Sequence, residues 1–216
     1  MSMVPKTASV SGGVLLHDVS WEEYTQMLRA FARQRSVRLT YDRGMLEIRT
    51  FHFRQYNSSR FLGRLISALT EEMNLPIAGG GSTTLRRRRR QRGLEPDECF
   101  WIANEPGVRG RERLNLRIDP PPDLAVEVGV TRSSIDRMAI YAALGVPEVW
   151  RLDVAGLTFH VLQPDGHYTP SPLSRSFPTV TAADLAGFLA LLGRQEENEI
   201  LRQFRAWVRQ RQGTLP

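Results

Sequence analysis

Hydrophobic residues near the start of the chain recur at the spacing of a helix. Between Ser20 and Gln34 they fall every three or four positions, which places them on one face of an α-helix. Ser20 lies just before this stripe and Glu23 follows three residues later, the arrangement of a capping box. The pattern therefore predicts an amphipathic helix over Ser20–Gln34.

Shorter apolar runs and further helical stripes predict the other elements. Short runs rich in β-branched and aromatic residues, bounded by turn residues, are typical of strands. The predicted strands are Val37–Tyr41, Met45–Arg49, Cys99–Ala103, Asp123–Val130, Glu148–Leu152 and Leu157–Leu162. The further predicted helices are Asn57–Met73, Ser134–Leu144, one that is capped by Thr181 and Asp184 and ends near Leu192, and Glu196–Gln210. Ser134 is the expected N-cap of its helix and Gly145 the C-terminal stop.

This order of elements favours an α/β (α+β) fold in which a mixed β-sheet is flanked by helices. A chain of 216 residues suits one domain with an added terminal element. We expect an N-terminal tail over residues 1–19 and a main domain over 20–170. The remaining residues, 171–216, should form a C-terminal helical extension packed on the same domain.

Composition narrows the class of protein. Apolar residues make up 41% of the chain, enough to bury a core. No apolar run reaches the roughly 18 residues of a membrane-spanning helix, and the N-terminus lacks the pattern of a secretory signal. The single cysteine, Cys99, excludes an internal disulfide and a multi-cysteine zinc site. A cytoplasmic protein without membrane contact is the simplest interpretation.

The charge of the chain is compatible with a nucleic-acid partner. The net charge is +6, and of the 29 basic residues only Lys6 is a lysine. Such a skew toward arginine also arises from codon composition, so charge alone does not identify a partner. Arg86, Arg87, Arg88, Arg89 and Arg90 form an uninterrupted run that either lies in solvent or contacts DNA phosphates, which guanidinium groups bind bidentately.

Two acidic residues share one face of the predicted strand Asp123–Val130. Side chains alternate along a strand, so Asp123 and Glu127 point away from the core, about 13 Å apart at roughly 3.3 Å per residue. That separation is too long for both to hold one ion on a straight strand. Glu127, set among apolar neighbours, needs a compensating partner, which is either an arginine or a metal ion such as Mg²⁺ or Mn²⁺.

A second acidic position strengthens the metal alternative. Asp97 follows Pro96 and precedes the strand that begins near Cys99. If the two strands are neighbours, Asp97 and Glu127 can lie together and bind one ion. Glu47 is a further candidate, although an exposed strand residue paired with an arginine is the simpler interpretation.

These motifs resemble a known family. Pro96-Asp97 followed by Glu127-Val128-Gly129 resembles the PD-(D/E)xK signature of restriction-endonuclease-like proteins, and longer strings are similar to the Uma-type family of bacterial endonucleases. The matching strings are Thr40–Ile48, Gly81–Thr84, Gly93–Phe100, Pro121–Val128 and Ser133–Arg151. The resemblance implies a restriction-endonuclease-like mixed sheet and Mg²⁺- or Mn²⁺-dependent cleavage of DNA. It also implies that Asp97 and Glu127 bind the metal.

The chain departs from the family pattern at the expected lysine. Gly129 stands where the signature has lysine, and Arg137 stands where relatives carry a lysine in the following helix. Arginine can stabilise phosphate charge but cannot take a proton from water. Gln55, with His52 close by, aligns with a histidine of the family, and Arg86 is another cationic candidate.

Three functional hypotheses remain open at this stage. The leading one is a metal-dependent DNA endonuclease with Asp97, Glu127, Asp123, Arg137 and Glu47 as candidate catalytic residues. The second is a catalytically degenerate DNA-binding or accessory protein that keeps the nuclease fold. The third is an interaction module that forms a homodimer through the helix containing Trp207.

Overall fold

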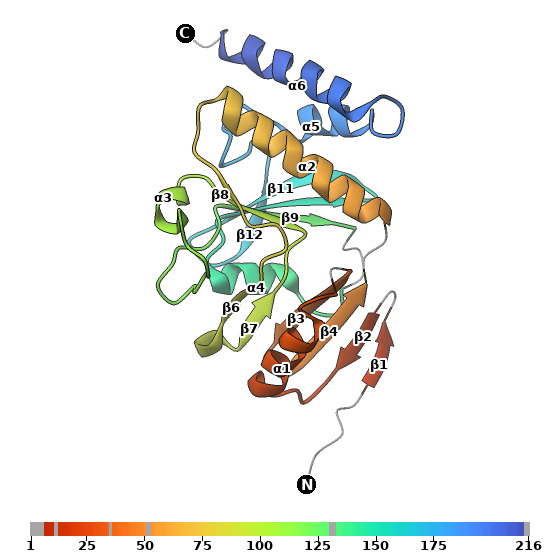
Figure 1. Ribbon diagram of the computed structural model, residues 1–216, viewed down its shortest axis with the longest axis vertical. Coiled ribbons are helices and arrows are strands. Elements are labelled where there is room, and N and C mark those ends of the chain that lie inside the picture. Colours follow the sequence, from red (N-terminus) through yellow and green to blue (C-terminus); the bar gives the residue numbers. More distant parts are fainter. Residues whose placement is uncertain (1–6, 11–12, 35, 51–52, 130–132, 214–216) are drawn as a thin grey trace.

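The structure is a computed structural model in which residues 7–10, 13–34, 36–50, 53–129 and 133–213 are described. Two sheets lie between helices (Figure 1). The strands are β1 Thr7–Val10, β2 Gly13–Leu16, β3 Val37–Asp42, β4 Met45–Thr50, β5 Ala78–Gly79, β6 Leu85–Arg87, β7 Arg92–Leu94, β8 Glu98–Trp101, β9 Leu124–Val128, β10 Glu148–Asp153, β11 Gly156–Leu162 and β12 Tyr168–Ser171. The helices are α1 Trp21–Phe31, α2 Phe53–Glu72, the 3₁₀ helix η1 Arg88–Arg90, α3 Glu105–Val108, α4 Arg137–Leu144, α5 Ala182–Leu189 and α6 Glu197–Gln212.

The strands form two sheets, which we call the N-terminal and the central sheet. The N-terminal sheet has the strand order β1-β2-β4-β3-β7-β6, and the central sheet the order β12-β11-β10-β9-β8-β5. In the central sheet β9 pairs in parallel with β10 and antiparallel with β8, so the sheet is mixed. The predicted mixed sheet with flanking helices is confirmed, whereas the second sheet was not predicted.

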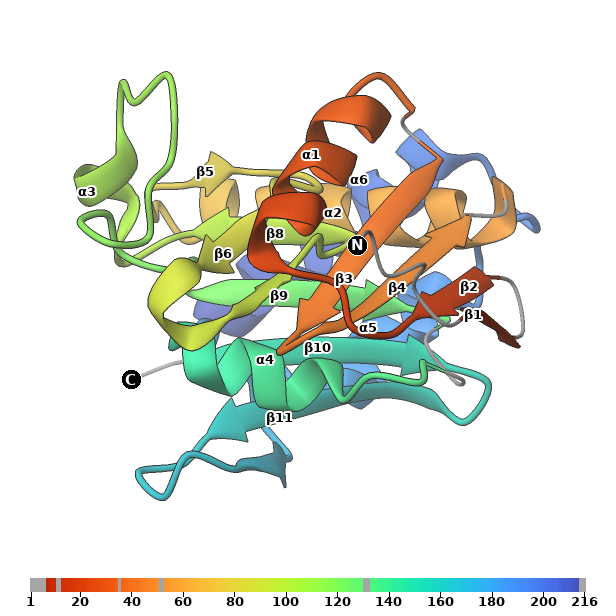
Figure 2. The ribbon, with the colours of Figure 1, turned by 90° about the horizontal axis from the view of Figure 1, so that it is seen from below.

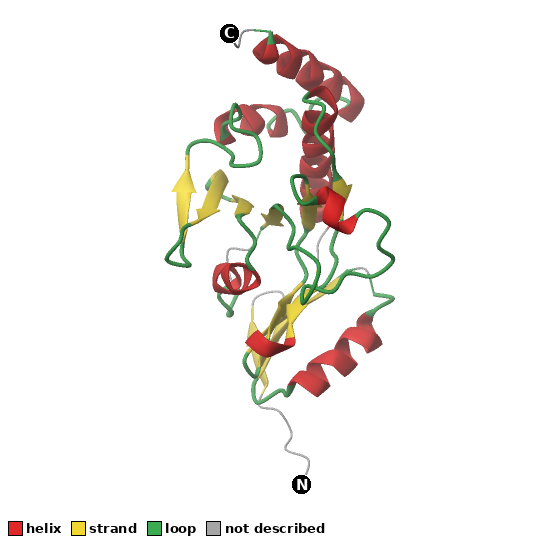
Figure 3. Ribbon diagram, turned by 90° about the vertical axis from the view of Figure 1, so that its left-hand side faces the viewer, coloured by secondary structure: helices red, strands yellow, loops and turns green. Residues whose placement is uncertain are grey.

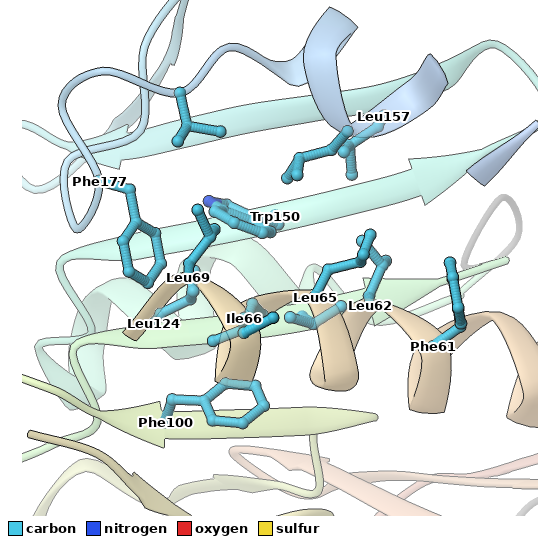
Figure 4. Packing of buried hydrophobic residues seen from close by; sticks show 14 of the residues in the cluster. Phe61, Leu62, Leu65, Ile66, Leu69, Phe100, Leu124, Trp150, Leu157 and Phe177 are labelled. Carbon is cyan, nitrogen blue, oxygen red and sulfur yellow. The ribbon is translucent and has the colours of Figure 1, made fainter. Parts of the chain in front are cut away.

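Helices cover both faces of the central sheet. Leu124, Val126 and Val128 of β9 pack on one face with α2, α5 and α6, as the alternation of this strand predicts. Figure 4 shows the core between α2 and the sheet, where side chains such as Leu65 lie over Trp150. Helix α4 and Ala125 belong to a separate apolar cluster on the other face. The strand β9 is therefore enclosed on both sides.

Local sequence signals explain where several helices begin and end. Ser20 and Glu23 form the predicted capping box of α1, and Gly145 ends α4 in a left-handed conformation. The predicted N-cap of α4 was wrong, because Asp136 rather than Ser134 accepts the hydrogen bond from the helix backbone. Ser134 instead donates its backbone N–H to a side chain of the N-terminal sheet.

The chain ends extend these layers. Strands β1 and β2 lie inside the expected N-terminal tail, and β2 pairs with β4. At the other end α5 and α6 pack on α2 (Figure 3), where Phe204 is fully buried. Trp207 lies inside this packing, with the guanidinium of Arg211 4.7 Å from its ring centre. Dimerisation through this helix stays a prediction.

None of the helices within the described ranges has both the length and the apolar character needed to cross a bilayer.

Candidate active site

The two acidic residues Asp97 and Glu127 meet beside β9. The backbone N–H of Asp97 donates to the carbonyl of Val126 at 3.1 Å, and the N–H of Val128 donates to Asp97 Oδ2 at 2.6 Å. These two contacts flank Glu127, so the strand pairing itself brings both carboxylates to one place. Two residues that are about thirty positions apart in the sequence are therefore neighbours in the structure.

Both carboxylates line a small cavity of about 20 Å³, a size that suits a water molecule or an ion. The other lining residues come from β3, β4, the start of α2, the segment before β8, β9 and α4. They are Arg38, Arg49, Thr50, Gln55, Glu95, Val128 and Arg137. The cavity therefore lies at the junction of the two sheets.

Glu127 is 3% exposed, and its two carboxylate oxygens have different surroundings. Oε1 accepts from Arg137 Nη2 at 2.5 Å and from the hydroxyl of Tyr141. Oε2 is buried, and no hydrogen-bond donor reaches it within the described part of the chain. A buried carboxylate oxygen without a partner is costly, so this atom is the place where an additional positive group would stabilise the site most.

Arg137 holds the site together. Besides Glu127, its guanidinium donates to the hydroxyl of Thr40 and, at 2.9 Å, to the carbonyl of Glu95. Although burial opposes the charge, the carboxylate of Glu127 raises the pKa of Arg137. The arginine is thus a fixed cation that cannot serve as a base. Of the two predicted partners of Glu127, an arginine or a metal ion, the arginine contacts Oε1. Oε2 has no hydrogen-bond partner among the described residues.

The pKa of Asp97 is also changed by its surroundings. Burial, followed by the nearby carboxylate of Glu127, raises its pKa well above the ordinary value, against the opposing effect of Arg137. Two buried carboxylates facing one cavity favour binding of a proton or a cation. Arg38, Arg49 and Arg137 also line the cavity, so the site combines the two buried carboxylates with three guanidinium groups.

A magnesium ion fits this donor set. Mg²⁺ keeps several waters and is commonly bound by one or two carboxylates together with substrate phosphates. Asp97 and the free Oε2 of Glu127 supply two such oxygens. The described residues contain no group of three or more His, Cys, Asp or Glu placed to hold a metal, so a tighter all-protein site is not formed by them.

Gly129 cannot easily carry the lysine of the family signature. Its φ is +72°, and a Cβ built on it would lie 2.2 Å from Nε2 of Gln55. The amide of Gln55 therefore occupies the space next to Gly129 and borders the same cavity. His52, the neighbouring alternative, lies outside the described residues.

The other acidic candidates have different partners. Asp123 Oδ2 accepts from the backbone N–H groups of Ile102 and Asn104 at 2.7 and 2.9 Å, and so fixes the turn after β8. Glu47 is fully buried, and its carboxylate accepts from the Ser133 hydroxyl at 2.7 Å. Neither is among the residues that line the cavity between Asp97 and Glu127.

The arginine run lies away from the carboxylates. Arg86 and Arg87 end β6 and Arg88–Arg90 form η1, with Arg87 half-buried and the other four exposed. Arg86 approaches Thr25 of α1 at 3.4 Å and is not a lining residue of the carboxylate cavity.

Several residues at or next to the cavity were not predicted. Thr40 and Tyr141 contact Arg137 and Glu127, and Arg38 and Arg49 line the cavity. Thr40 and Arg38 share one face of β3 by the alternation of strand side chains, which was a usable signal. Tyr141 lies four residues after Arg137, so both project from the same side of α4.

Comparison with known proteins adds independent information. A family model for Uma2, described as "Putative restriction endonuclease", matches residues 21–191. Among solved structures, a "putative nuclease belonging to DUF820" from Anabaena variabilis is similar, with a TM-score of 0.51 and 13% sequence identity over 70% of this chain and 90% of that one. No functionally curated protein matches the chain. At this identity the structural match shows the fold alone.

Proposed function

The chain belongs to the Uma2 family, which is described as "Putative restriction endonuclease", and from this premise we propose that it is a metal-dependent DNA endonuclease of the PD-(D/E)xK type. The observation that carries the proposal is the pair of buried carboxylates, Asp97 and Glu127, at one cavity with an unpartnered Glu127 Oε2. The fold and the family make phosphodiester hydrolysis the reaction to test.

Asp97 and Glu127 would hold Mg²⁺ or Mn²⁺ at the cavity. When bound, the cation supplies positive charge to the scissile phosphate and makes water easier to deprotonate. Arg137 and Tyr141 hold the Glu127 carboxylate in place through its other oxygen. Held in this way, Glu127 would need no rearrangement when substrate arrives.

Other residues of the cavity would handle the substrate. Arg38 and Arg49 line it with guanidinium groups, which suit the oxygens of a DNA phosphate. Gln55 borders the cavity with an amide, which can donate to or accept from the attacking water and so orient it. With arginine and glutamine at these positions, proton removal depends on the carboxylates or on solvent, which predicts a slower enzyme than one with a lysine base.

Plasmid cleavage tests the proposal directly. Supercoiled plasmid and linear DNA are incubated with purified protein in Mg²⁺, Mn²⁺ or EDTA. We expect nicking with either metal, none in EDTA, and loss of activity in Asp97→Ala and Glu127→Ala. Arg175→Gln, an exposed residue outside the cavity, is the matched control and should keep activity. Intact DNA at all metal concentrations would refute the enzyme claim.

One observation favours a second candidate function, a DNA-binding protein without catalysis. The position of the signature lysine is a left-handed glycine blocked by Gln55, and Arg137 is tied to Glu127. If DNA binding is unchanged in EDTA and cleavage is absent, this second function is the correct one.

A further inference from the structure

A large cleft lies on the side of α1, separate from the carboxylate cavity. It has a volume of about 540 Å³ and lies between α1, the β6–η1 region and the segment 114–117. We call it the basic cleft, and its residues are Trp21, Glu22, Thr25, Gln26, Arg29, Thr84, Leu85, Arg86, Arg88, Leu114, Asn115, Leu116 and Arg117. Figure 2 shows α1 beside β6.

Positive charge dominates the lining of the basic cleft. Arg29, Arg86, Arg88 and Arg117 contribute four guanidinium groups, and Glu22 is the single lining carboxylate. Glu22 is already paired with Arg88 at 2.5 Å. Across the described ranges, no carboxylate lies within 4 Å of the guanidinium of Arg29, Arg86 or Arg117. The cleft therefore presents uncompensated cations to solvent.

The walls of the cleft are fixed by contacts within the protein. Arg87 points away from its neighbours in the run and donates from Nε to the carbonyl of Leu116 at 3.0 Å. This bond ties the segment 114–117 to β6. Leu85 and Leu116 are buried, and Trp21 is 9% exposed. The exposed arginines thus project from elements that are anchored by buried residues.

The basic cleft and the carboxylates lie on opposite faces of the N-terminal sheet. Tyr41 of β3 stacks on Tyr24 of α1, with ring centres 4.7 Å apart, on the face that carries the cleft. The adjacent Thr40 points the other way and contacts Arg137. A ligand in the cleft is therefore distinct from the phosphate that would react beside Asp97.

We propose that the basic cleft is a second DNA-contact site, which holds the sugar-phosphate backbone of a DNA segment other than the one being cut. A polymer suits this surface because Arg89 and Arg90 continue the exposed cationic side chains along η1 beyond the cleft. Guanidinium groups on several elements suit successive phosphates of a backbone. That the same DNA is also cut rests on the proposed nuclease function, whereas binding in the cleft does not.

The test uses a double substitution from two walls of the cleft. Arg86→Gln with Arg117→Gln removes two exposed cations, and Arg175→Gln with Arg194→Gln removes two exposed cations elsewhere as the matched control. Fluorescence anisotropy with a labelled duplex is measured in EDTA at several salt concentrations. Loss of two phosphate contacts should weaken binding on the order of tenfold at 0.15 M salt and lower the salt slope by about two. The control pair should change both quantities far less.

The outcomes separate the cleft from catalysis. In a cleavage assay the cleft variant should raise KM and leave kcat unchanged, because its side chains do not touch the reacting phosphate. If wild-type protein cleaves nothing, the nuclease proposal fails while the binding assay still decides the cleft. Equal affinity and salt slope for the cleft variant and the control pair would overturn the proposal, as would the absence of duplex binding by the wild type or a preference for RNA over DNA.

Discussion

Replacing Asp97 by asparagine should remove most of the thermal stabilisation that divalent cations give to this protein. Asparagine has the same shape, and its amide oxygen can still accept from the backbone N–H of Val128. What it removes is the negative charge of Asp97 next to Glu127, in a cavity that Glu95 also lines. The substitution therefore isolates cation binding from packing.

The size of the effect follows from binding linkage. A cation present at 100 times its dissociation constant stabilises the folded state by about 2.7 kcal/mol. For a domain near this size, 1 kcal/mol corresponds to roughly 2–4 °C in Tm, so wild-type protein should gain about 5–10 °C in Mn²⁺ over EDTA. Asp97→Asn should gain less than about a quarter of that. Differential scanning fluorimetry across a Mn²⁺ titration measures both.

Asp123→Asn is the matched control for the same experiment. Asp123 is close to Glu127 in sequence, but its carboxylate accepts from the backbone of Ile102 and Asn104. This variant should keep most of its basal stability, because the amide oxygen of asparagine can still accept from both N–H groups, and it should keep the full Mn²⁺ gain. A gain in Asp97→Asn equal to that of the wild type, or no gain in the wild type, would refute the assignment of the cation to this pair.

Three further predictions concern the same site. Arg137→Ala leaves the buried Glu127 carboxylate without its cation and should cost about 3–5 kcal/mol in urea unfolding, whereas a loss below about 1 kcal/mol would contradict the role of this pair. Gly129→Lys should destabilise the fold by at least about 1–2 kcal/mol, because φ at this position is +72° and Gln55 fills the adjacent space. The variant should not cleave DNA faster than the wild type. Faster cleavage would show that Gln55 moves aside. The pKa of Asp97 is raised in the folded state, so in EDTA and above the ordinary pKa of 3.8 the folded state binds more protons than the unfolded chain. The free energy of unfolding should therefore fall as pH rises from 3.8 through the folded-state pKa of Asp97. Unfolding free energies measured from pH 4 to 8 should show this slope in the wild type and a flatter one in Asp97→Asn.

Much of the fold is readable from local pattern. The helix stripe after Ser20, the alternation of Leu124, Val126 and Val128, and the stop at Gly145 all lie where short-range chemistry decides the structure. The two-sheet arrangement was not readable, because the pairing of β3 with β7 joins residues that are far apart in the chain. Such pairings depend on tertiary packing rather than on local preference.

The candidate site could also be predicted only in part. Asp97 and Glu127 could be chosen because acidic residues beside apolar strands need a partner. The role of Asp123 in the turn after β8 could not, since Asp123 lies just before β9 and its partners, the backbone N–H groups of Ile102 and Asn104, are about twenty positions away in the chain. The partner of Glu127 was left open between arginine and metal, and the two carboxylate oxygens separate these possibilities.

Arg137 also links parts of the molecule that are far apart in the chain. From α4 its guanidinium reaches Thr40 in the N-terminal sheet, Glu127 in the central sheet and the carbonyl of Glu95 between them. Opening either sheet would break some of these hydrogen bonds and leave the buried guanidinium of Arg137 without its partners. The two sheets are therefore expected to unfold as one cooperative unit. Amide hydrogen exchange in β3 and β9 should then report a shared opening free energy, and the chain gains protection from partial unfolding at the place where its chemistry is assembled.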